Sequence, residues 1–317
     1  MRVLVLGGSG FIGSHVVDVL VERGFRVRVL SRRPEFFRSP VPSVEYVNGD
    51  FSNATLLPEL LMGMDAVVHL VSTTVPATSN MDPVADINGN LISTVNLLKA
   101  MRTVGLRNLV YLSSGGTVYG VPISDPVAEN HPLQPVTSYG IVKTAIEKYL
   151  HMSRYADGLR YCALRVSNPY GPRQGHGGVQ GVIGTYLWRV VNGQPVEVWG
   201  DGSIVRDFVY VRDIAELCVA AVSSDVSGVF NAGYGVGFSV LEVISLIEKV
   251  AGKKVKLEFK PGRSFDIPRI VLDISRTRAH LEWTPKVDLE EGIQKTWNWV
   301  LDQVEYGLPR GGANLAT

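Results

Sequence analysis

Residues 3–13 read VLVLGGSGFIG, and this stretch decides how the rest of the chain is interpreted. An apolar run, a glycine-rich turn with spacing G-x-x-G-x-x-G and apolar residues at helical intervals predict a strand, a tight turn and a helix. The first glycine allows the turn, the second lets the backbone approach a pyrophosphate, and the third permits close packing of the helix. The free amides at the helix start favour an anion. The candidate dinucleotide-binding residues are therefore Gly7, Gly10, Phe11, Ile12 and Gly13.

The first half of the chain repeats this alternation of strand and helix. Short β-branched runs predict strands at 2–6, 26–30, 44–47, 66–70, 108–112 and 161–165. Amphipathic segments predict helices near 11–23, 54–62, 83–104 and 138–155. Such alternation implies an α/β fold with a doubly wound parallel sheet, the Rossmann arrangement.

The second half has a different character. After about Ser167 it is rich in glycine and proline, with predicted helices near 179–192 and 239–251. The second of these opens with Ser239 and Glu242 at capping-box spacing. We expect a dinucleotide-binding domain at 1–167 and a smaller substrate-binding lobe at 168–317 that is interleaved with it.

The end of the second predicted strand bears on which dinucleotide is bound. An acid that accepts hydrogen bonds from the adenosine ribose is expected there, but the chain has Ser31, Arg32 and Arg33. Two cations favour the 2′-phosphate of NADP, whereas two solvated arginines on a loop would leave NAD in place. Asp50 follows the third strand and is a second candidate contact to the adenosine. The further candidates near the strand ends are Phe51, Leu70 and Ser113.

A tyrosine and a lysine provide the candidate catalytic pair. Tyr139 and Lys143 stand four residues apart in a predicted helix, which places them on one face, one turn apart. A phenol titrates near pH 10, but an ammonium and a positive nicotinamide ring beside it would lower its pKa. Ser114, at the end of a predicted strand, offers a hydroxyl that can hydrogen-bond a substrate oxygen as it becomes a carbonyl.

Composition excludes several classes of partner. The net charge is +1, and the 31 basic and 30 acidic residues are spread along the chain, so no basic patch predicts nucleic acid or a membrane surface. No apolar run approaches the length of a membrane span, and the chain start lacks the features of a signal peptide. Two cysteines in apolar runs predict buried free thiols, and the six histidines show no metal spacing. We expect a cytoplasmic protein without a metal site.

Taken together, these motifs resemble those of the extended short-chain dehydrogenase/reductases. More narrowly, the chain is similar to the UDP-glucose (UDP-galactose) 4-epimerase-like NAD-dependent epimerase/dehydratases over roughly residues 1–300. The similar segments include SSGGTVYG at 113–120, YGIVK at 139–143, RVSNPYGPR at 165–173 and VRDF at 205–208. The resemblance implies that Tyr139 is the acid/base, that Lys143 orients the nicotinamide ribose, that Ser114 assists at the sugar hydroxyl and that Asn90 contacts the cofactor.

The position of the family's catalytic serine in this sequence depends on how the motif is aligned. Counting forward from the strand places the family's catalytic hydroxyl on Ser114, whereas counting back from Tyr119 places it on Gly115. Ser114 is therefore the first candidate, and Thr117 is the second. For a UDP-sugar substrate, the resemblance implies that Arg206 and Arg263 hold the diphosphate, that Asn168 donates to a phosphate and that Asp266 contacts the nucleoside. Paired arginines suit this task because their planar forks match phosphate oxygens.

Several reactions reuse this pair of residues. The resemblance favours a UDP-hexose 4-epimerase that oxidises C4 to a ketone and returns the hydride to the opposite face. An NADPH-dependent nucleotide-ketosugar reductase and a UDP-glucuronate decarboxylase are the enzymatic alternatives, and a dinucleotide-binding sensor is the non-enzymatic one. The helices at 83–104 and 138–155 form a dimer interface in relatives, so the resemblance also implies a homodimer.

Overall fold

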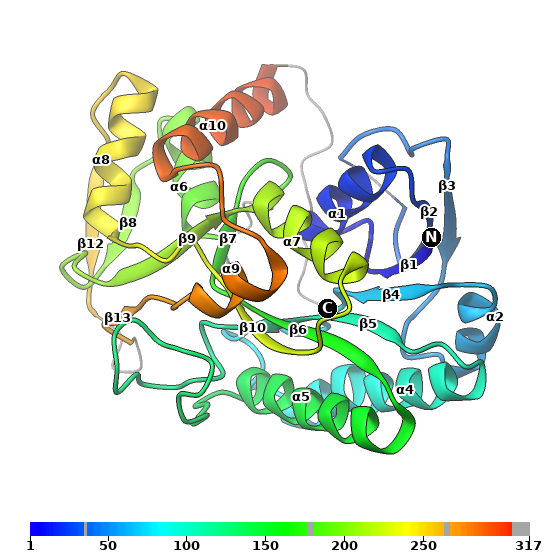
Figure 1. Cartoon of the computed structure of the whole chain (residues 1–317). Coiled ribbons are helices and arrows are strands. Elements are labelled where there is room, and N and C mark those ends of the chain that lie inside the picture. The colour runs from blue at the N-terminus through cyan, green and yellow to red at the C-terminus, as the bar shows by residue number, and fades with distance from the viewer. Residues whose placement is uncertain (35–36, 176–180, 263–266, 306–317) are drawn as a thin grey trace.

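A seven-stranded sheet organises the computed structural model, which describes residues 1–34, 37–175, 181–262 and 267–305 (Figure 1). The strands run in the order β10-β6-β5-β4-β1-β2-β3, and all neighbours are parallel. The strands are β1 (Arg2–Leu6), β2 (Arg26–Ser31), β3 (Val44–Asn48), β4 (Ala66–His69), β5 (Asn108–Ser114), β6 (Arg160–Val166) and β10 (Gly228–Ala232). The predicted doubly wound α/β fold is confirmed.

Helices cover both faces of this sheet. One face carries α1 (Phe11–Glu22) and α7 (Val211–Ser223), and the other carries α2 (Leu57–Leu61), α4 (Ser93–Thr103) and α5 (Ser138–Asp157) (Figure 1). Alternate residues of β1 serve the two faces: Val3 and Val5 pack with α1 and α7, whereas Leu4 and Leu6 pack with the helices opposite. A strand buried on both faces has no polar side, which explains the continuous apolar run in the sequence.

The strand order reverses beside β1. The chain moves from β1 outward through β2 to β3, and then returns to the other side of β1 with β4. In such sheets a crevice opens at the carboxyl ends of the strands where the order reverses, because the connecting loops leave in opposite directions. The glycine turn after β1 and the segment after β4 therefore lie at the edge where a ligand is expected.

The second half of the chain forms a smaller lobe and also returns to the large sheet. Its elements outside that sheet are β7 (Asn168–Tyr170), α6 (Val182–Val191), β8 (Val196–Trp199), β9 (Val205–Tyr210), β11 (Gly237–Ser239), α8 (Val240–Ala251), β12 (Leu257–Lys260), β13 (Arg269–Ile270), α9 (Ser275–Leu281) and α10 (Leu289–Glu305). β9 pairs with β7, β11 and β13 in a four-stranded sheet. Strand β10 and helix α7 complete the large sheet and its cover, so the two halves interleave.

Most predicted elements lie where the sequence placed them, with local differences. The predicted helix at 83–104 consists of three consecutive segments, α3 (Pro83–Asp86), the π-helical η2 (Ile87–Ile92) and α4, and the helix predicted at 54–62 begins as a 3-10 turn, η1 (Ala54–Leu56). The capping box of Ser239 and Glu242 is confirmed. Cys162 and Cys218 are buried free thiols, as predicted. None of the helices in the described part of the chain is long and apolar enough to span a membrane.

Candidate active site

The glycine turn closes tightly between β1 and α1. Gly7 adopts a φ of 84°, and its amide donates to the Leu30 carbonyl of β2 at 2.8 Å. Gly10 is the N-cap residue before α1 and provides no side-chain cap, so the first amides of the helix are not paired with a capping side chain. At Gly13 a Cβ would lie 2.1 Å from the Gly7 carbonyl oxygen. The predicted role of Gly13 in close packing is thus confirmed, and the turn forms a cradle suited to a pyrophosphate.

The end of β2 is tied to this turn by a side chain. The Ser31 hydroxyl accepts a hydrogen bond of 3.1 Å from the Ser9 amide. Arg32 and Arg33 follow as exposed residues, and neither forms an ion pair with any residue that the structure describes. The exposed Asp50 accepts hydrogen bonds from Ser52 that lower the pKa of its carboxyl, and the charge of Arg32 lowers that pKa further.

Phe51 and Leu70, two other candidate cofactor contacts, can reach a bound cofactor with main-chain atoms more readily than with their side chains. Phe51 is buried, with its ring 4.7 Å from the His69 ring, so the ring belongs to the core. Leu70 lies directly after β4, and its amide donates to the Leu6 carbonyl at 3.0 Å. Both residues lie at the carboxyl edge of the sheet, beside the glycine turn.

Tyr139 and Lys143 lie together in the first two turns of α5. The Lys143 ammonium is 5.4 Å from the centre of the Tyr139 ring and 4.8 Å from that of Tyr111. It donates to the Leu112 carbonyl of β5 at 2.8 Å, and the side chain is buried. Two side chains of the segment after β4 hold the start of α5. The Ser79 hydroxyl accepts a hydrogen bond from the Tyr139 backbone amide, and the Asn80 side-chain carbonyl accepts one from the Ser138 backbone amide. The predicted pairing of Tyr139 with Lys143 is therefore present.

Burial dominates the electrostatics of this pair. Tyr139 is half-buried, yet enough protein surrounds its hydroxyl for burial to raise the pKa to about 12, although a hydrogen bond with Ser72 lowers it. Burial also lowers the pKa of Lys143 to about 8. Burial is thus the dominant influence on the Tyr139 pKa in this structure, and the expected lowering by Lys143 and the nicotinamide ring together stays a prediction.

Asn90 and Ser113 have side chains that are already engaged. The Asn90 carbonyl oxygen accepts from the Thr73 amide at 2.9 Å, and its amide group donates to Asp86 at 2.8 Å. The Ser113 hydroxyl donates to buried Glu147 at 2.6 Å, away from the crevice. Asn90 thus shapes the segment after β4, and Ser113 has only its main chain to offer a cofactor.

Ser114 and Thr117 flank a position that cannot carry a side chain. A Cβ at Gly115 would lie 2.9 Å from the Arg165 carbonyl oxygen and 2.5 Å from a methyl of Leu272, so a serine does not fit there. The half-buried Ser114 ends β5, and its hydroxyl forms no hydrogen bond within the part of the chain that the structure describes. The Thr117 hydroxyl is buried and has no partner in that part either. Both hydroxyls therefore remain able to bond a ligand.

We expect Ser114→Ala to lower kcat about 100-fold, as the loss of one donor to a developing carbonyl oxygen does in other enzymes. Thr117→Val, which removes a hydroxyl of similar reach, is the matched variant and should lower kcat far less. Steady-state kinetics on both variants measure the difference. The reverse order of effects would assign the hydroxyl to Thr117.

Two candidates for the substrate lie on neighbouring strands of the small sheet. Asn168 in β7 donates to the Asp207 carbonyl of β9 at 3.0 Å. Arg206 in β9 is half-buried, and its guanidinium donates to the Val205 carbonyl at 2.9 Å. The other two candidates, Arg263 and Asp266, lie outside the described residues.

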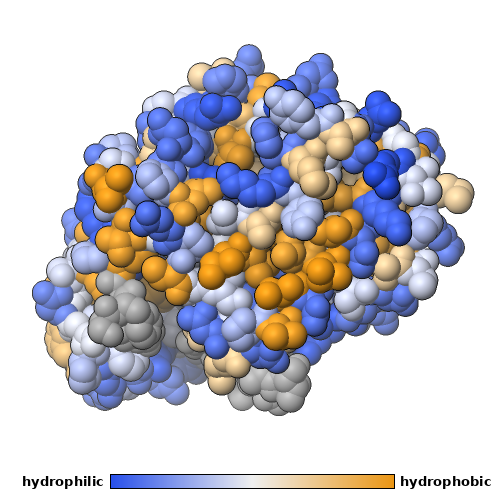
Figure 2. Space-filling view, turned by 90° about the horizontal axis from the view of Figure 1, so that it is seen from below, coloured by the Kyte–Doolittle hydropathy of each residue, from blue (hydrophilic) through white to orange (hydrophobic). Residues whose placement is uncertain are grey.

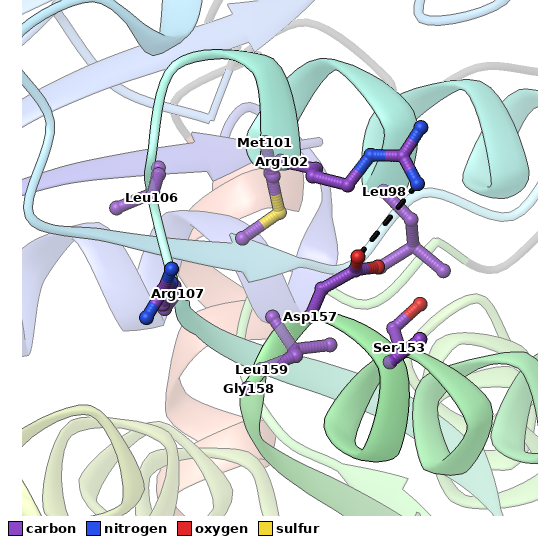
Figure 3. Close-up of a pocket in the computed structure, with 10 residues that line it drawn as sticks. Leu98, Met101, Arg102, Leu106, Arg107, Ser153, Asp157, Gly158 and Leu159 are labelled. Atoms are coloured by element: carbon purple, nitrogen blue, oxygen red, sulfur yellow. Dashed lines mark ion pairs between the residues drawn. The ribbon is translucent and has the colours of Figure 1, made fainter.

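A cavity of about 330 Å³ lies at the opposite edge of the sheet (Figure 3). It opens where α4 and α5 end, beside the starts of β5 and β6, and Arg102 and Asp157 form an ion pair of 3.7 Å across it. Parallel sheets carry their ligands at the carboxyl edge, so this cavity is remote from the glycine turn and from Tyr139. Within the described ranges, no group of His, Cys, Asp and Glu is arranged to hold a metal ion.

Sequence reasoning missed three residues of the segment after β4 and α3. Ser72 hydrogen-bonds Tyr139, Ser79 accepts from its amide, and Asp86 accepts from the Ser138 hydroxyl at 2.7 Å. Serines in a loop and a single acid in a predicted helix carry no distinctive spacing. Only the return of the chain to α5 brings them beside Tyr139.

Comparison with known proteins places this geometry in a family. Residues 3–233 match the model of the NAD dependent epimerase/dehydratase family. The chain is 38% identical to the UDP-glucose 4-epimerase of Mycolicibacterium smegmatis over 304 residues, 93% of this chain and 97% of the relative.

Two solved structures have the same fold over nearly the whole chain. The UDP-glucose 4-epimerase of Thermotoga maritima with UDP-glucose superposes with a TM-score of 0.92 and 32% identity, covering 96% of this chain and all of the other. The UDP-glucose 4-epimerase of Thermus thermophilus in complex with NAD gives a TM-score of 0.88 and 37% identity, covering 95% of this chain and 99% of the other. With its glycine cradle and its Tyr139–Lys143 pair, the chain belongs to the NAD dependent epimerase/dehydratase family.

Proposed function

We propose that this chain is a nucleotide-sugar epimerase that inverts C4 of a UDP-hexose. The observation that carries this proposal is the Tyr139–Lys143 pair at the carboxyl edge of the sheet, in a chain so similar to UDP-glucose 4-epimerases. A phenol that can take a proton from a hydroxyl, beside a dinucleotide site, is what alcohol oxidation requires. A sensor needs only the dinucleotide site, so the retained pair argues for catalysis.

The residues at the glycine turn fit NAD, the cofactor of the family. Gly13 leaves no room for a side chain, and the uncapped start of α1 presents the amides of Phe11, Ile12 and Gly13 to a pyrophosphate. The NADP alternative, which Arg32 and Arg33 left open, is not what the comparisons support: NAD occupies the related structure from Thermus thermophilus. When bound, NAD supplies an acceptor for the C4 hydride and a positive charge that favours the Tyr139 phenolate.

The chain's own residues then perform the proton chemistry. Tyr139 takes the proton of the sugar 4-hydroxyl as the C4–H bond breaks, which leaves a 4-keto sugar. Ser114 or Thr117 hydrogen-bonds the carbonyl oxygen, and Lys143 holds the nicotinamide ribose and stabilises the phenolate. The same tyrosine returns the proton after the keto sugar has turned and the hydride has added to its other face. Because one residue both takes and gives the proton, no net change remains on the protein.

We propose that the two parts of the chain divide this task. Residues 1–167 would hold the dinucleotide, and residues 168–317 would mainly hold the UDP-sugar. Arg206 and Asn168 support this division, because they lie on adjacent strands of the small lobe with polar side chains suited to phosphate oxygens. The proposed roles of Arg263 and Asp266 stay predictions.

We propose a homodimer that forms through the helical segments at 83–104 (α3, η2 and α4) and through α5. Figure 2, which views the molecule from the side of these helices, shows hydrophobic residues gathered there. The exposed apolar side chains include Ile92, Ile141, Met152 and Tyr155, and Tyr155 is 85% exposed. Exposed apolar patches of this kind mark protein contacts. Light scattering that returned the mass of one chain would contradict the dimer. Cytoplasmic localisation stays a prediction that the two buried free thiols support.

Incubation of the purified protein with UDP-glucose, UDP-glucuronate and their N-acetyl relatives tests the proposed function. We expect conversion of a UDP-hexose to its 4-epimer without added cofactor, followed by chromatography or NMR of the anomeric proton. Stoichiometric consumption of NADPH with a UDP-4-keto sugar as the hydride acceptor would indicate a reductase, and release of CO₂ from UDP-glucuronate would indicate a decarboxylase. A protein that binds NAD and converts none of these sugars would be a sensor.

A further inference from the structure

Asp86 is a fully buried carboxylate beside the catalytic helix. Its side chain accepts three hydrogen bonds: from the Thr74 hydroxyl at 2.8 Å, from the Asn90 amide group at 2.8 Å and from the Ser138 hydroxyl at 2.7 Å. All three partners are neutral donors, and Asp86 forms no ion pair within the described ranges of the chain. A buried acid is costly unless its acceptors are satisfied, so a site with three donors is built for the carboxylate.

The hydrogen bonds of Asp86 join three segments that converge on Tyr139. Ser138 starts α5, one residue before the tyrosine. Thr74 belongs to the segment that carries Ser72 and Ser79, both of which bond Tyr139. Asn90 lies in the π-helical η2, four residues after Asp86, so the two side chains share one side of the helical segment. Asp86 therefore holds the start of α5 against the segment after β4.

Asp86 is also one of the charged groups that affect the pKa of Lys143. Five titratable groups face the ammonium: His69 of β4, Tyr111 of β5, Asp86 of α3, and Tyr139 and Glu147 of α5. His69 is buried, and burial with the Lys143 charge lowers its pKa to about 3, so it is neutral. Asp86 and Glu147 both raise the pKa of Lys143, against the lowering effect of burial.

Glu147 is compensated by another cation, and Asp86 is not. The Glu147 carboxylate forms a buried ion pair of 2.7 Å with Arg165 and accepts from Ser113. The Arg165 charge therefore offsets part of the effect of Glu147 on Lys143, and Asp86 has the larger effect of the two acids. Among the described residues, Asp86 is the acid near Lys143 that forms no ion pair, and its charge acts over a longer distance in surroundings of low polarity.

We propose that Asp86 is a positioning residue of the epimerase reaction, whose carboxylate keeps Lys143 in its ammonium form and anchors the start of α5 beside Tyr139. This role rests on the proposed function, because the ammonium matters only if Tyr139 exchanges a proton with a substrate. The negative charge also disfavours the phenolate, so Asp86 raises the pKa of both Tyr139 and Lys143.

The pH dependence of kcat in Asp86→Asn tests this role. Loss of the charge lowers the pKa of both Tyr139 and Lys143. The acidic and the basic limb of the plot of kcat against pH should therefore both move to lower pH by about one unit. Asp82→Asn is the matched control: Asp82 is exposed, caps α3 through the Ala85 amide, and lies four residues away. Asparagine also caps helices, so this control should leave both limbs in place. A uniform loss of kcat in D86N with unmoved limbs would overturn the proposal.

A spectroscopic titration provides a readout that does not depend on turnover. The ultraviolet absorbance of the Tyr139 phenolate, obtained as the difference between each protein and its Tyr139→Phe version, should appear at lower pH in D86N than in the wild-type chain. Asp86→Ser is a second neutral variant with the same expectation if D86N does not fold. A wild-type chain without turnover would refute the proposed function alone, whereas an unchanged phenolate titration would refute the role of Asp86 alone.

Discussion

Tyr139→Phe should lower kcat about 1,000-fold and leave the KM for the UDP-sugar nearly unchanged. Positioned acid/base groups contribute 100-fold to 10,000-fold, and here one hydroxyl both removes and returns the proton. At 1.36 kcal/mol for each tenfold, this loss corresponds to about 4 kcal/mol of transition-state stabilisation. The variant keeps the ring that packs against the Lys143 ammonium, and it loses only a hydrogen bond with Ser72, which costs about 1 kcal/mol of folding free energy.

The same substitution elsewhere on the helix provides the control. Tyr149 also lies in α5, and its side chain is 38% exposed. Tyr149→Phe should retain wild-type kcat, which shows that removal of a phenol hydroxyl from this helix is harmless in itself. If Tyr139→Phe turned over the sugar at the wild-type rate while thermal unfolding confirmed its fold, Tyr139 would not be the acid/base.

Gly13→Ala should abolish NAD binding and destabilise the protein, although alanine favours helices. Alanine within a helix stabilises by about 1 kcal/mol relative to glycine. At this position, however, its Cβ would lie 2.1 Å from the Gly7 carbonyl oxygen and 2.8 Å from the Gly8 Cα. Both are backbone atoms of the turn, so α1 must move away from β1, and overpacking of this kind costs about 1–3 kcal/mol or more. The turn that holds the pyrophosphate is displaced with it.

Gly10→Ala separates the cofactor effect from the folding effect. A Cβ at Gly10 would be 3.3 Å from the Gly7 carbonyl oxygen, a contact that a small shift relieves. We expect G10A to unfold near the wild-type temperature and to bind NAD at least about tenfold more weakly, because the methyl group faces the expected path of the pyrophosphate. Calorimetric titration with NAD and thermal unfolding compare the two variants. Wild-type affinity in G13A would show that NAD does not bind at this turn.

The sequence was sufficient for the features that local pattern controls. Residues 3–13 predict strand, turn and helix because glycine is the residue that tolerates the positive φ of Gly7 and the helix contact at Gly13. The i, i+4 spacing places Tyr139 and Lys143 on one face of α5, since a helix repeats every 3.6 residues. The capping box at Ser239 is equally local. Such patterns hold because their partners lie within one or two helical turns.

Tertiary structure decided the rest, because it depends on residues far apart in the chain. β10 joins the large sheet by pairing with β6, which lies more than sixty positions earlier in the chain. The five residues of β10 have no sequence pattern that predicts this pairing. Asp86 and Ser138 meet across 52 positions. The spacing of Tyr139 and Lys143 predicts only the charge beside the phenol, whereas burial by the assembled fold raises the pKa of Tyr139 to about 12. Desolvation is set by everything that surrounds a group, so only the packed structure reveals it.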